Sequence, residues 1–364
     1  MRIVVTGATG NAGTSVVAAL AADPRVTEIV GLARRRPALT SPHTTWVEAD
    51  VVSAPLSELF ARADAVVHLA WLIQPSRDEA MLEAVNVTGS RRVFEAAAAA
   101  GAGALVYASS VGAYSPGPGD RAASAGGSSP GSGDRAVDES WPTDGIPSSF
   151  YARHKAAAES ALDAVEAAHP ELRVVRLRPA LIFKREAASG IRRLFAGPLL
   201  PSPLVRPSLL PLLPLPDGLR VQAVHADDVA EAYRLAATDE RARGAYNVAA
   251  DPVLDAETLG RALGARPVSV PVRAVRAAAD LTWRLRLQPT PPGWLDMGMS
   301  VPVMDSGRIR RELGWSPRRS AEDALLELLE GIRERAGAPT PPLDPRAGGP
   351  LRWREFATGV GARP

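Results

Sequence analysis

Cysteine is absent from the 364 residues, so disulfide frameworks, thiolate metal sites and cysteine nucleophiles are all excluded. The five histidines are scattered without the spacing of metal ligands, and no metal site is expected. No run reaches the roughly 18 to 20 uninterrupted apolar residues that a membrane-spanning helix needs. Any catalysis must therefore use oxygen and nitrogen groups, and no membrane partner is expected.

An excess of charge of either sign is also absent, because 42 basic residues face 40 acidic ones. No long stripe of Lys or Arg appears, so a nucleic-acid partner is not expected. With 46% apolar residues, the composition predicts a soluble globular protein of one large or two modest domains. Met1 leads straight into an apolar run without a targeting core, which predicts a cytoplasmic protein.

From residue 2 to about 110, short β-branched runs alternate with longer Ala-rich stretches, which is the pattern of βαβ units. Right-handed crossovers would place the helices on both faces of a parallel sheet. The second half is predicted to be richer in helices. The predicted strands are 2–6, 27–32, 45–48, 64–69, 104–108, 172–177, 221–224 and 244–249, and the predicted helices are 13–22, 78–100, 151–168, 227–237, 255–263, 270–287, 305–313 and 319–335.

Three segments break this rhythm. Ser, Gly and Pro fill 14 of the 21 positions of 115–135, which predicts a flexible surface insert. Seven prolines fall within 198–216 and exclude a helix or a central strand there. That segment is either an irregular apolar cover over a substrate pocket or a poorly ordered surface loop. Pro, Gly and Arg dominate 336–364, which predicts a mobile tail.

A glycine motif, TGATGNAG at 6–13, connects the first predicted strand to the first predicted helix. Glycine in such a turn lets backbone amides and the helix N-terminus approach a pyrophosphate, whose charge the helix dipole favours. A tight strand-to-helix turn without a ligand is the alternative. The residues expected at the pyrophosphate are Gly7, Gly10, Asn11, Ala12 and Gly13.

Three arginines, Arg34, Arg35 and Arg36, follow the second predicted strand. A dinucleotide fold usually has an acid there, which holds the adenosine ribose hydroxyls. Guanidinium groups instead suit a 2′-phosphate, because they form charge-assisted contacts. We therefore expect NADP(H) in preference to NAD(H), although a solvated cluster in an Arg-rich chain would look the same.

Tyr151 and Lys155 lie one turn apart on one face of a predicted helix. An ammonium group near the phenol lowers its pKa, which makes Tyr a usable acid or base for a carbonyl or an alcohol. The chain has only two lysines, Lys155 and Lys184, among its 42 basic residues. Arg could not replace a compact ammonium in this role, because it differs in shape and hydration.

Ser110 comes directly after the predicted strand 104–108, at the edge where parallel sheets place their ligands. Its hydroxyl could donate a hydrogen bond to a substrate carbonyl. A serine at the end of a strand also commonly serves as a turn or cap residue.

Together these motifs resemble the extended short-chain dehydrogenase/reductase family, which includes NAD-dependent epimerase/dehydratase proteins. The resemblance covers residues 1 to about 335 and implies a Rossmann-type, doubly wound α/β fold with a smaller, helix-rich C-terminal substrate-binding region. Further similar segments, in order, are ADV at 49–51, HLAW at 68–71, NVTG at 86–89, RPA at 178–180, VHADDV at 224–229 and LGWSP at 313–317.

The resemblance implies a catalytic triad of Ser110, Tyr151 and Lys155, with Tyr151 as the acid or base and Lys155 at the cofactor ribose. It also implies that Asp50 and Val51 contact adenine. Leu69 and Ala70 would lie near the cofactor, and Pro179 beside the nicotinamide. Three residues of the similar segments are expected to be structural, namely Asn86, which would orient a loop, and His225 and Asp228, at an Asp-capped helix start.

Departures from the family pattern narrow the reaction. Val111 and Gly112 follow Ser110 where sugar 4,6-dehydratases carry an Asp-Glu pair, so dehydration is not expected. Trp71, Phe183 and the Pro/Leu segment suggest an apolar pocket. The sequence thus favours an NADP(H)-dependent oxidoreductase of a small carbonyl or alcohol. The alternatives are a nucleotide-sugar epimerase with bound NAD and a non-catalytic dinucleotide-sensing protein.

We divide the chain into a dinucleotide-binding domain, 1–180, and a mainly substrate-binding region, 181–335. The strand and helix of 221–249 are expected to return to the first domain. A small-molecule substrate is the expected partner. The predicted helices 78–100 and 151–168 could also pair with their copies in a homodimer.

Overall fold

The computed structural model describes residues 1–73, 77–118, 136–195 and 211–346. A seven-stranded, fully parallel sheet runs through its centre in the order β10-β6-β5-β4-β1-β2-β3. This order reverses direction between β1 and β4, the place where doubly wound folds bind dinucleotides. Its strands are β1 (Arg2–Thr6), β2 (Glu28–Ala33), β3 (Thr44–Glu48), β4 (Ala65–His68), β5 (Ala104–Ala108), β6 (Arg173–Pro179) and β10 (Gly244–Val248).

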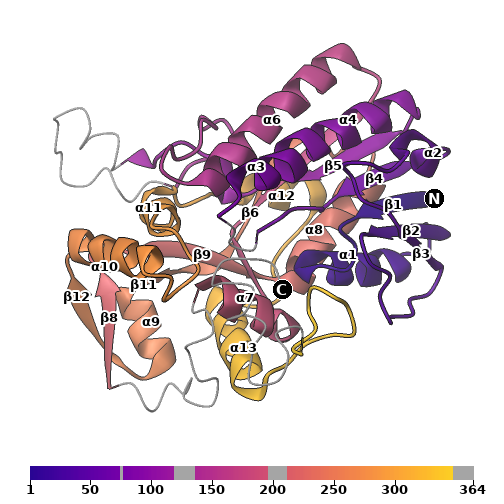
Figure 1. The fold of residues 1–364 in the computed structure, drawn as a ribbon. Coiled ribbons are helices and arrows are strands. Elements are labelled where there is room, and N and C mark those ends of the chain that lie inside the picture. The colour runs from indigo at the N-terminus through magenta and orange to yellow at the C-terminus, as the bar shows by residue number, and fades with distance from the viewer. Residues whose placement is uncertain (74–76, 119–135, 196–210, 347–364) are drawn as a thin grey trace.

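Helices cover both faces of this sheet (Figure 1). Ile3 and Val5 of β1 pack into the core shared with α1 (Asn11–Ala21) and α8 (Ala226–Thr238). Val4 points to the other face, where α2, α4 and α6 lie. Successive side chains of a buried strand thus point alternately into two hydrophobic cores, one on each face of the sheet. The predicted α/β fold is confirmed. These three helices are α2 (Leu56–Phe60), α4 (Gly89–Ala99) and α6 (Phe150–Ala168).

The predicted helix 78–100 is interrupted. It consists of α3 (Glu79–Glu83), a π-helical turn at Ala84–Thr88 and α4. Such π-helical turns are often found at functional sites. Here the turn contains Asn86, whose side chain is fully buried and holds the loop after β4.

The remaining elements form a smaller part of the molecule. A three-stranded sheet of β11, β9 and β7 packs on α13, and a two-stranded sheet of β12 and β8 lies beside α9 and α10 (Figure 1). The bounds are β7 (Leu181–Phe183), α7 (Ala188–Phe195), β8 (Leu212–Pro216), β9 (Arg220–His225), β11 (Ala250–Asp255), α9 (Ala256–Leu263), β12 (Arg266–Val270), α10 (Val272–Arg284), α11 (Gly293–Ser300), α12 (Gly307–Leu313) and α13 (Ala321–Glu334).

The prediction that residues 221–249 return to the large sheet is correct for only part of that segment. Helix α8 packs on α1, and β10 pairs with β6, as expected. The predicted strand 221–224 corresponds to β9, which pairs with β7 and β11 in the smaller sheet instead. The chain therefore crosses between the two parts more than once.

Three predicted irregular segments are partly described. The start of the 115–135 insert is not loose, because Ser115 is buried and its hydroxyl donates to Asp144 at 2.7 Å. The Pro-rich segment 198–216 ends in β8, an edge strand that prolines tolerate. The predicted mobile tail is anchored at 336–346, where Thr340 and Leu343 are buried. Residues 119–135, 196–210 and 347–364 lie outside the described part of the chain.

No helix of the described residues is long and apolar enough to cross a bilayer.

Candidate active site

The loop between β1 and α1 folds tightly onto itself, and two glycines allow this. Gly7 has a φ of +68°, and a Cβ there would lie 2.6 Å from the Ala70 nitrogen. A Cβ at Gly13 would lie 2.3 Å from the Gly7 carbonyl oxygen. A side chain at Gly7 would push the loop away from the segment after β4, and one at Gly13 would push α1 away from the loop, so both glycines are needed for its shape.

Gly10, by contrast, faces open space. A Cβ there would meet only the Gly7 carbonyl oxygen, at 3.4 Å. Gly10 is also the N-cap of α1, whose first turn carries no acidic side chain. The first amides of a helix have no intrahelical acceptor and attract anions. The loop, with Asn11, Ala12 and Gly13 in the first turn of α1, therefore has the shape and polarity that a diphosphate needs.

The predicted adenosine side lies at the ends of β2 and β3. Arg34 and Arg35 are exposed directly after β2, and Arg34 is close enough to Asp50 for their charges to interact. The Asp50 side chain accepts a hydrogen bond from Val52 at 2.9 Å, and Arg92 donates to the carbonyl of Val51. The structure thus brings the two arginines and the predicted adenine contacts to the same end of the sheet.

His68, at the end of β4, is fully buried between two hydroxyls. Its Nδ1 lies 2.7 Å from the Thr6 hydroxyl, and its Nε2 lies 2.9 Å from the Ser90 hydroxyl. Burial, together with the positive charge of Lys155, lowers the pKa of His68 to about 3. A neutral imidazole at this position fixes Thr6, which in turn accepts a hydrogen bond from the backbone of Ala70. His68 therefore supports the glycine loop.

Ser110 and Tyr151 are brought together at the end of β5. Burial raises the pKa of Tyr151 to about 12, although the nearby Ser110 hydroxyl acts to lower it. The Ser110 oxygen accepts from the Gly112 amide at 3.1 Å, so its own proton stays available for donation. Gly112 leaves room for the tyrosine, because a Cβ there would lie 2.9 Å from the Tyr151 ring.

Lys155 lies one turn after Tyr151 on α6 and is almost fully buried. Its ammonium donates to the Ala108 carbonyl at 2.6 Å and lies 3.4 Å from the centre of the Trp71 ring. The centre of the Tyr151 ring is farther away, at 5.9 Å. Burial pushes the pKa of Lys155 well below its usual value. The expected lowering of the Tyr151 pKa by Lys155 is thus not seen in this arrangement, in which Trp71 covers the ammonium.

A buried ion pair that the sequence analysis did not identify lies behind Lys155. Glu159, one further turn along α6, binds Arg178 through two contacts of 2.8 and 2.6 Å. Arg178 also donates to the Tyr114 hydroxyl at 2.9 Å. The helical spacing of Tyr151, Lys155 and Glu159 would have indicated that Glu159 shares this face. Its pairing with a residue of β6 has no local signal.

Aromatic and sulfur side chains line the other side of Tyr151. The rings of Trp294 and Trp71 have centroids 5.0 and 5.9 Å from that of Tyr151. The Met297 sulfur is 3.1 Å from where a Cβ of Gly112 would lie. The sequence had marked Trp71 as an apolar candidate. Trp294 and Met297, from α11, were missed because nothing in their local sequence distinguishes them from ordinary core residues.

Leu69 and Pro179, the other residues predicted near the cofactor, follow or end strands at the same edge of the sheet. The Leu69 amide donates to the Thr6 carbonyl at 3.1 Å, which places it beside the glycine loop. Pro179 is the buried last residue of β6 and pairs with Val248 of β10. Neither side chain carries chemistry of its own, so each can only shape the site.

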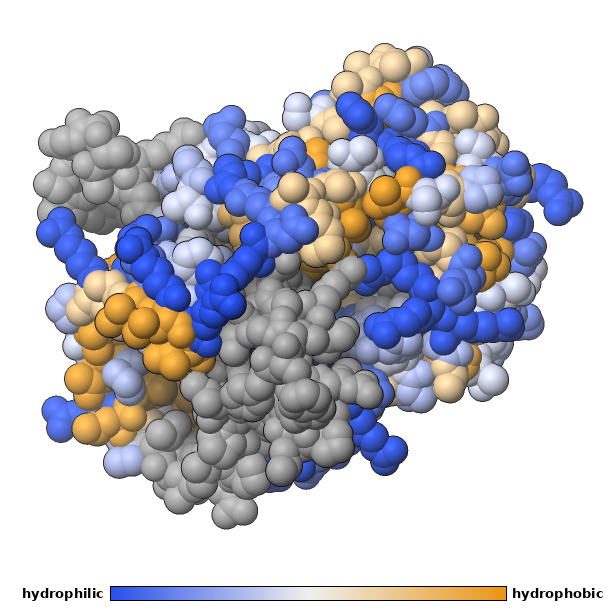
Figure 2. All heavy atoms as spheres, viewed as in Figure 1, coloured by the Kyte–Doolittle hydropathy of each residue, from blue (hydrophilic) through white to orange (hydrophobic). Residues whose placement is uncertain are grey.

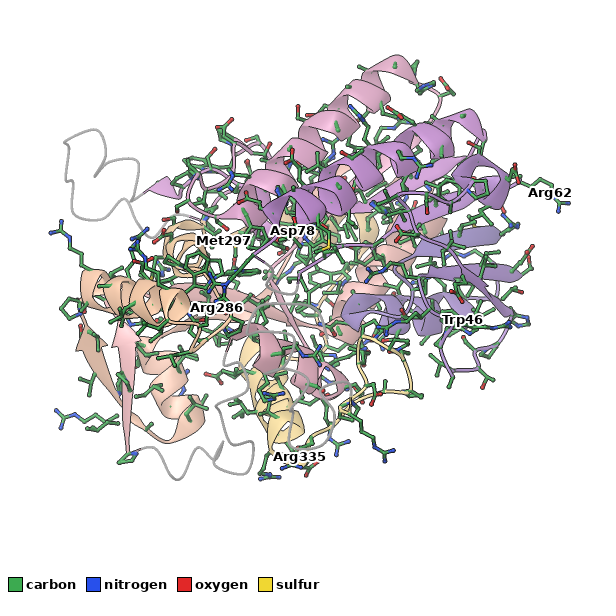
Figure 3. The ribbon with its side chains drawn as sticks, in the orientation of Figure 1. Trp46, Arg62, Asp78, Arg286, Met297 and Arg335 are labelled. Carbon is green, nitrogen blue, oxygen red and sulfur yellow. The ribbon has the colours of Figure 1, made fainter. Side chains whose placement is uncertain are left out.

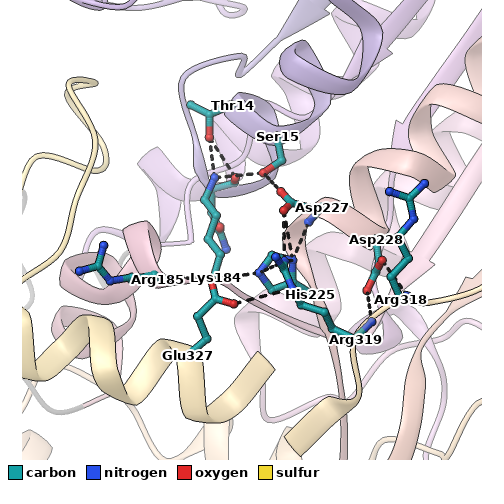
Figure 4. Close-up of polar contacts among 11 residues, drawn as sticks. Thr14, Ser15, Lys184, Arg185, His225, Asp227, Asp228, Arg318, Arg319 and Glu327 are labelled. Atoms are coloured by element: carbon teal, nitrogen blue, oxygen red, sulfur yellow. Dashed lines mark hydrogen bonds and ion pairs between the residues drawn. The ribbon is translucent and has the colours of Figure 1, made fainter. Parts of the chain in front are cut away.

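The second lysine, Lys184, belongs to a separate polar network at the start of α1 and α8 (Figure 4). It donates to the Thr14 hydroxyl at 2.6 Å and to the Ser15 hydroxyl at 3.3 Å. Ser15 donates to Asp227 at 3.0 Å, and the Asp227 amide donates to His225 at 3.1 Å. The N-cap of α8 is thus His225, not an aspartate as the sequence suggested.

Asp228 has a structural role, as expected. Its carboxylate accepts hydrogen bonds from the amides of Arg318 and Arg319 at 3.0 and 3.2 Å (Figure 4). Its carbonyl accepts from the Trp315 indole at 2.8 Å. These bonds fasten the segment before α13 to the start of α8.

Comparison with known proteins identifies the family. The model of the NAD dependent epimerase/dehydratase family matches residues 3–249. An uncharacterized protein of Mycobacterium tuberculosis is 28% identical over 342 residues, which cover 93% of this chain and 31% of that protein. The chain spans about a third of the length of the first curated relatives that it matches.

Two relatives have named activities. The UDP-glucose 4-epimerase of Mycolicibacterium smegmatis is 27% identical over 354 residues, which cover 92% of this chain and all of that enzyme. The L-arabinose 1-dehydrogenase (NAD(P)(+)) of Haloferax volcanii is 41% identical over 109 residues, which cover 30% of this chain and 41% of that enzyme.

Among solved structures, a short-chain dehydrogenase/reductase superfamily protein of Agrobacterium tumefaciens with bound NAD has a TM-score of 0.66 at 22% identity. The match covers 92% of this chain and 98% of that one. This likeness supports the fold, and its low identity supports no more than the fold.

Proposed function

The chain belongs to the NAD dependent epimerase/dehydratase family of extended short-chain dehydrogenase/reductases, and from this premise we propose that it is an NAD(P)-dependent oxidoreductase of a small carbonyl or alcohol. The observation that carries the proposal is the meeting of Ser110 and Tyr151 at the carboxyl end of β5, where Gly112, two residues after the serine, lies against the tyrosine ring. Lys155 follows one turn later on α6. Hydroxyl, phenol and ammonium groups thus meet where parallel sheets bind their ligands.

The residues fit a dinucleotide. The open face of Gly10 and the first amides of α1 suit the diphosphate, and Arg34 and Arg35 suit a 2′-phosphate. A nicotinamide bound at this edge would donate hydride to a carbonyl carbon or accept it from an alcohol carbon.

Tyr151 would move the proton. In the reducing direction the phenol, which keeps its proton at neutral pH, gives that proton to the carbonyl oxygen. In the oxidising direction the phenol must first give up its proton, and the resulting phenolate takes the proton of the alcohol. Ser110 would donate a hydrogen bond to the same substrate oxygen. The Gly112 amide donates to the serine oxygen, so the serine O–H is left free to donate. Lys155 would hold the cofactor ribose once Trp71 no longer covers its ammonium.

The lining of the site favours an apolar substrate. Trp71, Trp294 and Met297 present apolar faces near Tyr151. A diphosphate sugar would need cations and donors there instead. Dehydration is disfavoured as well, because Val111 and Gly112 occupy the place of the acid pair, and Gly112 is needed for the close approach of Tyr151.

The test is Tyr151→Phe. Turnover of a carbonyl panel should fall by about two to four orders of magnitude, the usual contribution of a general acid, while cofactor affinity stays nearly unchanged. Tyr246→Phe serves as the matched control, because its hydroxyl hydrogen-bonds Glu312 of α12 and contacts none of the three site residues. Unchanged turnover in Tyr151→Phe would remove this residue from the mechanism.

The preference for NADP(H) is tested by thermal unfolding of the cofactor-free protein with NADPH and with NADH. A ligand at about 100 times its Kd adds about 2.7 kcal/mol to the free energy of unfolding. We expect the larger shift with NADPH, and Arg34→Gln with Arg35→Gln should remove the difference. Arg62→Gln, an exposed arginine outside the site, should leave it intact. An equal or larger shift with NADH would contradict the preference.

A nucleotide-sugar epimerase is the second candidate, favoured by the full-length match to the UDP-glucose 4-epimerase of Mycolicibacterium smegmatis. Epimerases of this kind oxidise and re-reduce one substrate and keep their cofactor. The distinguishing observation is NAD that stays with the protein through purification and is released on denaturation. Release of NAD together with activity on a UDP-sugar would replace the first proposal.

A further inference from the structure

Helix α10 differs from the other helices of the described chain that exceed one or two turns, because none of its 13 residues is buried. Its outward face has an apolar stripe of Ala274, Ala278, Leu281 and Leu285, spaced i, i+4, i+7 and i+11. This spacing keeps the four side chains on one side of the helix. Leu281 is 58% exposed and Leu285 is 60% exposed, so the stripe lacks a partner within the described molecule.

Further apolar side chains extend this surface. Leu287 follows the helix and is 47% exposed, and Leu212 and Val268 of the two-stranded sheet are also exposed. Figure 2 shows the apolar surface over α10 and the β8–β12 sheet, with hydrophilic side chains around it. Contiguous apolar surface on a folded chain commonly marks a site of interaction.

The charge of this surface is uneven with respect to the rest of the chain. Residues 266–287 contain five arginines and one aspartate, a net charge of +4, whereas the whole chain carries only +2. The other 342 residues therefore sum to −2. Arg266, Arg273 and Arg286 are exposed and form no ion pair with the described residues. Positive charge is thus concentrated around the leucines.

We propose that α10 and its flanking segments, residues 266–287, dock the protein onto an anionic membrane surface. An interfacial helix places its leucines among the lipid chains and its arginines at the headgroups, and it does not need to span the bilayer. A second copy docked through the same face would oppose two surfaces of net charge +4. A nucleic acid would leave the leucines in water, because its backbone binds cations.

The docking surface adjoins the substrate side of the site. Arg77, from the loop that carries Trp71, stacks on Trp283 of α10 at 4.3 Å from its ring centre. Helix α11, next along the chain, contributes Trp294, which packs on Tyr151. Docking through α10 would therefore place the apolar lining of the site near the membrane.

The test is flotation of the full chain with vesicles of pure phosphatidylcholine and with equimolar phosphatidylcholine and phosphatidylglycerol. We expect binding to the anionic vesicles only, and weakening of that binding by salt. Leu281→Asp with Leu285→Asp should lower the binding constant by about tenfold or more, and Arg273→Glu with Arg286→Glu should do the same. These side chains are exposed, so the fold should survive, and thermal unfolding checks this.

The controls are Leu326→Asp, at an exposed leucine of α13, and Arg62→Glu, at an arginine far from Arg286 at the right-hand end of the molecule (Figure 3). Both should bind vesicles like the unaltered chain. The proposal is overturned if the chain does not float with anionic vesicles, or if the leucine pair binds as well as the controls. A dimer in sedimentation that the leucine pair abolishes, without vesicle binding, would assign this face to a second copy instead.

Discussion

At the scale of single residues, Gly112 shows how the site depends on an absent side chain. The position adjoins Ser110 and faces both Tyr151 and Met297. A methyl group there would meet the tyrosine ring at 2.9 Å and the methionine sulfur at 3.1 Å. The methionine can move, but the tyrosine ring is packed against two tryptophan rings. The absence of a side chain at Gly112 therefore determines the position of the Tyr151 phenol.

We expect Gly112→Ala to lower turnover by about tenfold to a hundredfold, because displacements below about 1 Å at reacting groups have effects of this size. The cofactor-induced thermal shift should stay, because the glycine loop is untouched. Steady-state kinetics with the substrate found in the carbonyl panel would measure the effect. Gly298→Ala is the control, since a Cβ there meets nothing within 4 Å. Equal turnover in the two variants would show that the position of Tyr151 is not limiting.

His68 makes a prediction about pH. Its folded pKa of about 3 lies below its ordinary 6.5, so unfolding takes up a proton between these values. The free energy of unfolding should therefore fall as the pH falls below 6.5, by about 1.4 kcal/mol per pH unit for one proton. Urea unfolding between about pH 7 and pH 5 should show a shallower dependence in His68→Gln than in the control His169→Gln, whose side chain is exposed. Equal slopes would show that His68 does not titrate this way.

At the scale of elements, the sequence predicted the strands of the large sheet well because the central ones are short apolar runs buried on both faces. β1 and β5 have the predicted bounds, β2 begins and ends one residue later than predicted, and β3 begins one residue earlier. The strands β7, β8, β11 and β12 were missed. They belong to small sheets whose pairing is decided by contacts between distant segments, and β8 contains two prolines.

The candidate site divides in the same way. Gly7, Ser110 and Tyr151 could be predicted because each belongs to a motif that is local in the sequence. Trp294 contacts the same tyrosine through the tertiary fold and has no such signal. The cover of Lys155 by Trp71 depends on how the loop after β4 is held. Spacing along α6 places the lysine on the right face but does not say what the ammonium contacts.

The segment after α13 was expected to be mobile, and its described part instead fastens the glycine loop. The Thr340 hydroxyl donates to the Thr9 carbonyl at 2.9 Å, and the Ala38 amide donates to the Pro339 carbonyl at 3.1 Å. Leu343 is 3% exposed. The proline and glycine content of this segment predicted that it has no helix or strand. A segment without regular structure can still make ordered contacts, as this one does.

A chain that ends after Arg335 should therefore be less stable than one that ends after Arg346. The loss of Leu343 burial and the Thr340 hydrogen bond should lower the free energy of unfolding by about 2–4 kcal/mol. Thermal unfolding of the two chains would measure this, and Thr340→Val in the full chain isolates the hydrogen bond. If both truncated chains unfold at the same temperature, the segment does not support the loop.

At the scale of the whole molecule, the two parts are interwoven. The chain leaves the large sheet after β6, builds β7 and β9 of the smaller sheet, returns as α8 and β10, and leaves again as β11. Tyr233 and Ala236 of α8 are fully buried in the core that contains Ile3 and Val5 of β1. A boundary at residue 180 therefore divides one hydrophobic core.

This predicts that residues 1–180 do not fold alone, although they contain the glycine loop and the triad. The fragment lacks α8, which covers α1, and β10, which pairs with β6 along Val175 to Pro179. Uncovering this core costs more than the roughly 5–15 kcal/mol by which domains are stable. Circular dichroism should show no cooperative unfolding and no cofactor-induced stabilisation, whereas residues 1–346 should show both. Cooperative, cofactor-sensitive unfolding of 1–180 would mean that the first six strands carry the dinucleotide site by themselves, and that α8 and β10 only add to a domain that is already complete.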